Sequence, residues 1–361
     1  MAVPVFVRRF RFVGILTVVA VYVLILVGGV VRSTGSGMGC PDWPKCFGSW
    51  VPPTRLEQLP ANYKEVYTAQ RVAKNQKLAA RLEQLGFHQV AGDIFDHPTQ
   101  YIETDFNAVK TWIEYLNRLI GALIGVFVFG TVVFALPYWR RDPPVFWLAL
   151  ASFLLTGVQG WLGSLVVSTN LLPIMVTIHM GLALVIVALL LYAVSRSQRV
   201  AGEAEEAVLR PVPGLTLVLG VAVVLTFGQI VLGTQVREQI DLIAAASNYL
   251  NRGDWVAQLG NTFKVHRSFS ALLLVLNLYL AYRLYGLPSR RLHRLATAIV
   301  VLIGGEILAG ITLAYLEFPA FAQPVHLTLA TVLFGAQFLA LVAYRQTTKL
   351  QQQVATPAVV A

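Results

Sequence analysis

The chain has 361 residues, of which 56% are hydrophobic and only 13% are charged. Soluble domains have an apolar share of about 45–50% and a charged share of about 25%, so this composition excludes an ordinary soluble protein and predicts a bilayer-embedded one. The formal net charge is +10. Many of the basic residues lie in short loops between apolar runs, a pattern typical of membrane topology, so no nucleic-acid partner is expected.

Apolar runs of about 20 residues are long enough to cross roughly 30 Å of hydrocarbon as helices. Eight such runs follow one another along the chain, at residues 12–31, 112–136, 145–167, 174–194, 212–233, 263–285, 295–316 and 325–344. We therefore predict an all-α integral membrane protein with eight transmembrane helices, arranged as two four-helix bundles related by a pseudo-twofold axis.

Basic residues in the short connections predict the orientation, because Lys and Arg in short loops stay on the cytoplasmic side. They precede the first run and fall between the second and third, the fourth and fifth, and the sixth and seventh, for example at Arg140, Arg141, Arg290, Arg291 and Arg294. All lie on one side if both termini are cytoplasmic. We expect a multi-pass protein of the bacterial cytoplasmic (inner) membrane.

The long outer loop at 32–111 holds both cysteines, Cys40 and Cys46. In an oxidising compartment this pair favours a disulfide bond; two free or metal-binding thiols are the alternative. Further along the loop, the leucines of the stretch 63–85 have helical spacing and Gly86 is placed to end the helix. We expect a small helical cap here and another in the outer loop of the second half.

The chain repeats itself, with residues 1–200 forming one half and 201–361 the other. The interval from Gly163 to His179 is 16 residues, and the interval from Gly310 to His326 is the same. Two further pairs occur in the same order: Gly28 to Arg32 matches Gly233 to Arg237, and Asn117-Arg118 matches His266-Arg267. Because each half has four crossings, the repeat is parallel and its pseudo-twofold axis should run along the membrane normal.

Three histidines lie at the outer beginnings of predicted helices, and an ionisable residue inside a membrane is a functional candidate by default. His266 and His326 occupy the second and fourth helices of the second half at similar depth. Two imidazoles facing each other in a four-helix bundle can ligate a heme iron from both sides. The alternative is a hydrogen-bonded structural histidine at each position.

The first half is not a copy of the second. Asn117 stands where the second half has His266, so His179 alone would hold a porphyrin iron and one axial face would stay open. Glu114 lies three residues before Asn117, on the same helical face. A buried carboxylate beside an open face is typical of a reaction site; the alternative is that Glu114 only pairs with Arg118 at i+4. Candidate partners for heme propionates are Arg32, Arg118, Arg237 and Arg267.

These motifs resemble the heme A synthase family. The resemblance covers nearly the whole chain except the insert at about 55–105. It rests on the Gly28–Met38 run with the adjacent cysteines, on Glu114-x-x-Asn117-Arg118, on Thr177-Ile178-His179, on Val265-His266-Arg267 and on Gln323-Pro324-Val325-His326.

The resemblance implies a heme-dependent oxidoreductase that oxidises a methyl group of heme O to the formyl group of heme A. It implies iron ligation of a resident heme b by His266 and His326, binding of the substrate heme at His179, and Glu114 as the catalytic carboxylate. Many members of the family have His where this chain has Asn117. Heme O synthase and an electron-transfer protein are the implied partners, beside the membrane lipid.

Two rival functions remain open from the residues. A b-type electron-transfer cytochrome would hold heme in both halves and change nothing chemically, but it would prefer paired histidines in each half, which Asn117 does not provide. A small-solute transporter can also be built from parallel repeats, but it leaves His266 and His326 without a role.

Overall fold

The computed structural model describes residues 3–95, 103, 105–169, 171–198, 210–247 and 250–355. Within these ranges the protein is helical and has no β-strand; only an isolated bridge joins Cys46 and Ser49. Eight helices are long and apolar enough to cross a membrane, which confirms the predicted number. They are α1 (Val5–Ser33), α4 (Ala108–Ala135), α5 (Pro143–Ser168), α6 (Pro173–Ser197), α7 (Leu215–Ala246), α9 (Asn261–Tyr285), α10 (Arg290–Tyr315) and α11 (Ala322–Ala355).

The helices extend beyond the apolar runs from which they were predicted. The largest difference on the outer side is in α7, whose apolar run ends at 233 but whose helix continues to Ala246. Hydropathy marks where a helix leaves the hydrocarbon, and the backbone can stay helical beyond that point. The outer turns of α7 bury Ile240 and Ala244 against Trp255 and Leu259, so packing outside the membrane supports the extension.

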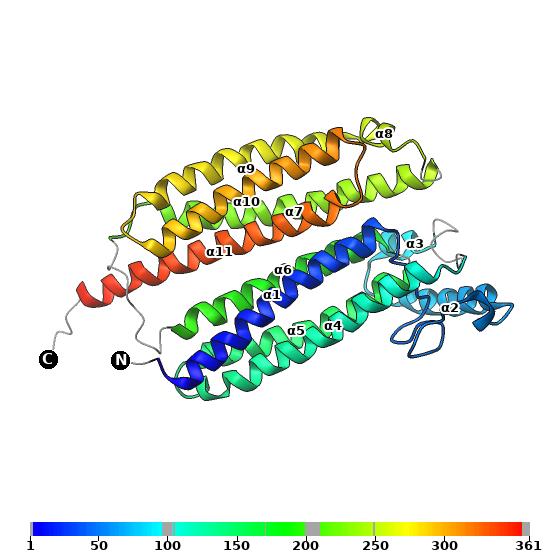
Figure 1. The fold of residues 1–361 in the computed structure, drawn as a ribbon, viewed down its shortest axis with the longest axis horizontal. Coiled ribbons are helices and arrows are strands. Elements are labelled where there is room, and N and C mark those ends of the chain that lie inside the picture. Colours follow the sequence, from blue (N-terminus) through cyan, green and yellow to red (C-terminus); the bar gives the residue numbers. More distant parts are fainter. Residues whose placement is uncertain are drawn as a thin grey trace.

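The helices form two groups of four (Figure 1), with α1, α4, α5 and α6 in one group and α7, α9, α10 and α11 in the other. Contacts between the groups run mainly from α1 to α11 and from α6 to both α7 and α11. At the first contact Gly29 lies against Pro324; at the second the hydroxyls of Thr177 and Thr234 are 2.8 Å apart. The predicted boundary between the halves, at residues 200 and 201, lies outside the described residues.

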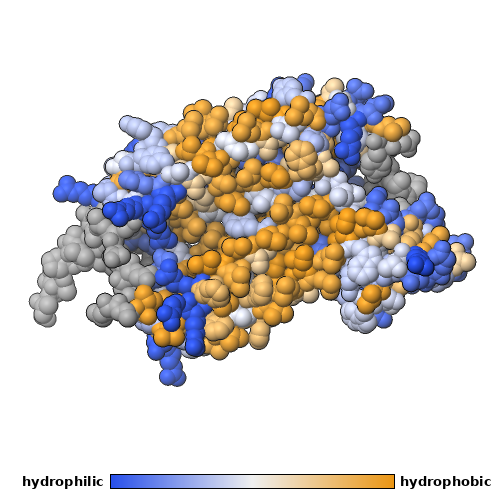
Figure 2. Space-filling view, viewed as in Figure 1, coloured by the Kyte–Doolittle hydropathy of each residue, from blue (hydrophilic) through white to orange (hydrophobic). Residues whose placement is uncertain are grey.

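On the face drawn in Figure 2 an apolar belt crosses the middle of the molecule, and polar residues gather at both ends. Large apolar side chains such as those of Phe12, Phe129 and Leu308 are exposed on the helices. In a soluble protein so large an exposed apolar surface would be a liability. Here it is the surface expected to face lipid tails.

Short helices lie outside the belt, at the end opposite to the start of α1 and the end of α11 (Figure 1). The first half carries α2 (Tyr63–Gln84) and α3 (His88–Asp93), and the second half carries α8 (Arg252–Trp255). Gly86 follows α2 with φ of +85°, so the predicted helix and its glycine stop are confirmed. Three 3₁₀ turns complete the described structure, at Leu56–Gln58, Leu136–Tyr138 and Val256–Gln258.

The first-half cap has a small core of its own. Ile94, after α3, packs with Leu172 and Met175 at the start of α6, and Leu78 and Leu82 of α2 cover them. The cap therefore rests on the first bundle at the start of α6.

The cap also buries an ion pair, in which Arg71 contacts Glu103 at 2.6 Å while the two side chains are only 2% and 3% exposed. Burial raises the pKa of Glu103, and the Arg71 guanidinium opposes that rise. The pairing fixes α2 to the chain that leads back into α4.

Candidate functional site

His266 on α9 and His326 on α11 face each other in the second bundle. Their ring centroids are 6.4 Å apart and the ring planes differ by 76°. A metal ion bound to one nitrogen of each ring, at about 2 Å per bond, would set the ring centres roughly 6 Å apart. The structure thus brings together the two residues predicted as iron ligands, at a separation that fits one metal ion between them.

Glycines make room for these imidazoles. A Cβ atom on Gly233 of α7 would lie 3.4 Å from Cε1 of His266, and one on Gly310 of α10 would lie 3.6 Å from Cε1 of His326. Among the described residues, no group of three or more His, Cys, Asp or Glu side chains is placed to hold a metal ion. A porphyrin supplies four nitrogen ligands itself, so two facing histidines suffice for heme iron.

His179 on α6 has a similar environment in the first bundle. A Cβ atom on Gly163 of α5 would lie 3.6 Å from its Cε1, matching the pair of Gly310 and His326. Gln159 donates from Nε2 to the backbone carbonyl of His179 at 2.8 Å. The Nδ1 atom of His179 and Oδ1 of Asn117 are both buried and have no hydrogen-bond partner among the described residues. Orphaned buried polar atoms of this kind indicate a place for a missing ligand.

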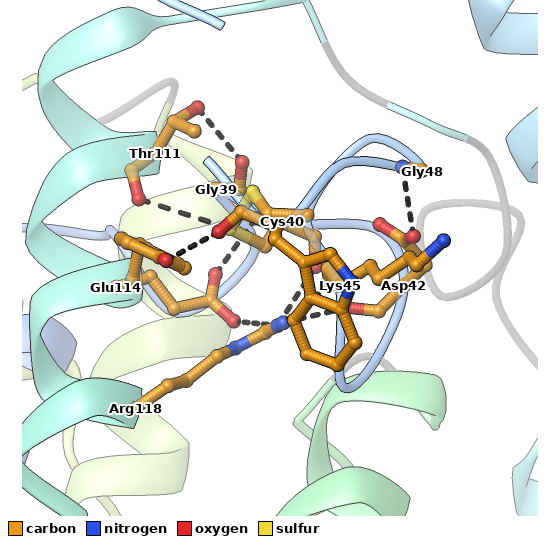
Figure 3. The surroundings of a disulfide bond; sticks show 11 residues. Gly39, Cys40, Asp42, Lys45, Gly48, Thr111, Glu114 and Arg118 are labelled. Atoms are coloured by element: carbon orange, nitrogen blue, oxygen red, sulfur yellow. Dashed lines mark hydrogen bonds and ion pairs between the residues drawn. A yellow bond between two sulfur atoms is a disulfide. The ribbon is translucent and has the colours of Figure 1, made fainter. Parts of the chain in front are cut away.

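Glu114 lies one turn before Asn117 on α4 and is only 3% exposed. Its Oε2 accepts a hydrogen bond from the backbone amide of Cys40 at 2.9 Å, and its Oε1 pairs with Arg118 (Figure 3). The i+4 ion pair left open by the sequence is therefore present. Figure 3 also shows that the carboxylate points toward the loop of the disulfide.

The loop over Glu114 is closed by a disulfide between Cys40 and Cys46, as predicted. Arg118 reaches across it and donates to the carbonyl oxygens of Asp42, Lys45 and Cys40, at 2.6, 3.0 and 3.2 Å. The Thr111 hydroxyl donates to the carbonyl oxygen of Gly39 at 2.8 Å. These bonds hold the loop against the start of α4, and they occupy the Arg118 guanidinium.

The other candidate arginines lie near the end of the molecule that carries the short helices α2, α3 and α8. Arg32 on α1 and Arg237 on α7 both bind the carboxylate of Asp241, at 3.0 and 2.6 Å, so the equivalent arginines of the two halves meet at the seam between them. Arg237 also contacts Oε1 of Gln323. Arg267 is exposed, and its guanidinium lies 5.8 Å from the centre of the Phe263 ring.

Glu306 on α10 is a site residue that we did not predict. Its Oε2 is in direct contact with Nδ1 of His326, and the side chain is only 9% exposed. The sequence contained the signal, because a carboxylate inside a predicted transmembrane helix is costly and usually functional. Glu306 also lies in the stretch that reveals the repeat, four residues before Gly310, as Gln159 lies four before Gly163.

Known proteins resemble this chain over long stretches. A protein named Heme A synthase from Shewanella oneidensis is 27% identical over 249 residues, which are 68% of this chain and 62% of that protein. A Heme A synthase from Rhizorhabdus wittichii is 27% identical over 61% of this chain and 58% of its own length. With one from Alkalihalophilus pseudofirmus, identity is 21% over 91% of this chain and 95% of the relative.

The matches to the first two relatives thus span about 60% of those proteins. The sequence model of the family described as cytochrome oxidase assembly protein, COX15-CtaA, matches residues 11–338, which include both bundles and all the candidate site residues. The chain therefore belongs to the COX15-CtaA family of cytochrome oxidase assembly proteins.

Proposed function

We propose that the protein is a heme A synthase, an oxidoreductase that converts a methyl group on the porphyrin of heme O to the formyl group of heme A. The observation that carries this proposal is the asymmetry between the bundles. One has His266 and His326 face to face at 6.4 Å, and the other has a single histidine, His179, with Asn117 in the place of its partner. The names of the relatives agree with this function.

In this proposal residues 201–361 hold the resident heme b. His266 and His326 would provide the axial nitrogens, and Gly233 and Gly310 leave space for the imidazole edges. A bound heme b would supply one-electron transfer. Gln229 holds the backbone of His266, because its Nε2 donates to the carbonyl oxygen of His266 at 2.9 Å. This bond helps to fix the part of α9 from which the imidazole extends.

Residues 1–200 would hold the substrate heme. His179 would bind its iron from one side, and Asn117, a poor iron ligand, would leave the other side open. The orphaned Nδ1 of His179 and Oδ1 of Asn117 support a ligand at this place. Two successive two-electron oxidations of one methyl carbon, each adding the oxygen of a water molecule and releasing two protons and two electrons to the electron-transfer partner, would give a geminal diol. The diol loses water to become an aldehyde.

Glu114 is our candidate for the catalytic carboxylate. A carboxylate beside the reacting carbon would accept protons released during its oxidation, as a general base does. The disulfide loop keeps water from the carboxylate, and the Cys40 amide and Arg118 fix it. A substrate at this place would compete with Arg118 for Oε1, the oxygen that the loop amide leaves available.

Arg32 and Arg237 are suited to heme propionates because each already binds a carboxylate, that of Asp241, at the outer end of its helix. Arg267 is exposed near the start of α9 and would bind a propionate at the surface of the bundle. Arg118 is committed to the disulfide loop, so it would act on the substrate mainly through Glu114.

The cellular setting is part of the proposal. The capped end, with α2, α3 and α8, would face the periplasm, and both termini would lie in the cytoplasm of a bacterial cell, in its inner membrane. Heme O would arrive from a heme O synthase, and an electron-transfer partner would take up the electrons.

The test is to express the full chain in a host that makes heme O but lacks its own heme A synthase. Pigments are extracted from the purified protein and separated by chromatography. We expect heme A together with heme b. A purified protein that contains heme b alone, despite a heme O supply, would favour an electron-transfer cytochrome; a colourless protein would favour a transporter.

The role of Glu114 needs a variant that keeps its structural contact. In Glu114→Gln the amide oxygen still accepts from Cys40, but the negative charge is lost. We expect heme O to accumulate while heme b content and protease resistance of the disulfide loop stay at wild-type levels. Unchanged heme A output would remove Glu114 from the mechanism, and Glu57→Gln, in the exposed part of the loop, is the control.

A further inference from the structure

Glu306 distinguishes one histidine from the other two. The Nδ1 atoms of His179, His266 and His326 are all buried, and none of them makes a hydrogen bond of regular geometry among the described residues. The Nδ1 atom of His326 differs from the other two because it lies in direct contact with a carboxylate oxygen, Oε2 of Glu306. A carboxylate that is 9% exposed inside a membrane-spanning helix is costly, so a compensating interaction is needed, and His326 provides it.

The internal repeat shows what contact is made when an uncharged residue stands at the position equivalent to Glu306. Gln159 occupies in α5 the place that Glu306 occupies in α10, four residues before the glycine that packs on the histidine. Its amide donates to the backbone carbonyl of His179 and does not bind the ring. The exchange of an amide for a carboxylate in the second half therefore moves the contact from the backbone to the imidazole.

We propose that Glu306 is a positioning residue that sets the electronic character of His326 as an iron ligand. In this proposal Nδ1 of His326 carries the proton and turns it toward the Glu306 carboxylate that lies against it, which fixes the tautomer and leaves Nε2 for the metal. The negative charge raises the basicity of the imidazole and stabilises oxidised iron more than reduced iron. The bound heme b then has a lower midpoint potential and is a stronger reductant.

This inference rests on the proposed heme b between His266 and His326. It adds that the two ligands are unequal, because His326 has a buried carboxylate behind it and His266 has none. A low-potential cofactor follows from this chain's own side chains.

The test is a redox titration of the purified full-length protein, followed by the absorbance of its b-type heme. In Glu306→Gln, which restores the residue found in the first half, we expect heme b to remain low-spin and bound. The equilibrium constant for its reduction should rise by about tenfold or more, which is about 59 mV per tenfold for a one-electron couple. The electron paramagnetic resonance spectrum of the oxidised heme should also change, because the imidazole loses its charged partner.

Glu317→Gln is the matched control. It removes the same charge from an exposed position just after α10, where the charge is screened by solvent, so the heme b potential should stay at the wild-type value. An equal shift in both variants would show that the heme potential responds to the overall charge of the protein and not to the contact between Glu306 and His326. That result would overturn the proposal.

The remaining outcomes separate the two hypotheses. If Glu306→Gln loses heme, Glu306→Asp should retain it with a potential nearer the wild-type value; loss of heme in both variants makes Glu306 a structural residue and overturns the inference. A low-spin heme b whose potential is unchanged in Glu306→Gln overturns it as well, while the proposed function stands. If His326→Ala keeps the wild-type heme spectrum, the proposed heme b site itself is wrong.

Discussion

The backbone amide of Cys40 donates a hydrogen bond to Oε2 of Glu114, at 2.9 Å and across 74 positions of sequence. One half of the disulfide and the candidate catalytic carboxylate are thus directly linked. The conformation of the loop places the amide that holds the carboxylate, and the disulfide constrains that conformation.

Replacing both cysteines, in Cys40→Ser with Cys46→Ser, should loosen this arrangement. Loss of so short a covalent loop costs about 2 kcal/mol by the chain-entropy estimate. If the proposed function is right, we expect faster proteolysis of the loop and a higher ratio of heme O to heme A, with heme b unaffected because its proposed site lies in the other bundle. Pigment analysis and limited proteolysis measure both effects. A normal pigment ratio in a variant with a demonstrably opened loop would contradict the link to Glu114.

Gly233→Val should displace His266. The glycine already lies so close that a Cβ would be 3.4 Å from the imidazole, and the methyl groups of valine extend further. We expect loss of most of the low-spin heme b, measured as bound heme per protein. Gly304→Val on α10 is the control, since a Cβ there meets nothing within 4 Å. Retention of heme b in Gly233→Val would show that the imidazole has room elsewhere.

Gly29→Ala should strain the seam between the halves. The new Cβ would lie 2.9 Å from Cβ and 3.0 Å from Cα of Pro324, so the backbone of one helix must move. Overpacking of this kind costs about 1–3 kcal/mol, which should lower the apparent melting temperature in detergent. Gly28→Ala is the neighbouring control, because a Cβ there meets nothing within 4 Å. Equal melting temperatures for both variants would contradict this close approach.

Arg71→Met should destabilise the first-half cap, because it leaves Glu103 buried without its partner. Breaking a buried ion pair costs about 3–5 kcal/mol. Burial already raises the pKa of Glu103, and loss of Arg71 raises it further. Such a group stabilises the cap fully below its unfolded-state pKa and loses that contribution as the pH rises through its folded-state pKa, so the defect should shrink on acidification.

Hydrogen exchange in α2, measured at several pH values, checks the behaviour of the cap. The double variant Arg71→Met with Glu103→Gln should recover much of the protection at neutral pH, because no buried charge remains. A cap that is equally protected in the wild type and in Arg71→Met would show that the ion pair is not needed.

The membrane-spanning fold could be predicted because its cause is local. Each helix needs an apolar run of sufficient length, and the run is visible in the sequence. The outer end of α7 could not be predicted this way, because its turns up to Ala246 are held by Trp255 and Leu259 from a later segment.

The parts of the candidate site that follow from helix order and from the repeat could be predicted from the sequence. The parts that depend on how a loop folds back onto a helix could not. The close approach of His266 and His326 could be predicted because they lie on the second and fourth helices of the second half at similar depth. The contact between Cys40 and Glu114 depends on how a loop folds back, which no spacing rule gives. Glu306 was missed because glycines and histidines, and not charges, were used to align the halves.

The close packing of Gly29 on Pro324 has a consequence for motion. Two helices this close cannot slide or separate at that point without losing the contact, which limits the relative motion of the two bundles there. If the proposed hemes are bound at His179 in one bundle and at His266 in the other, the contact would help to hold the distance between them. Electron tunnelling is very sensitive to such a distance, because its rate falls exponentially with the gap.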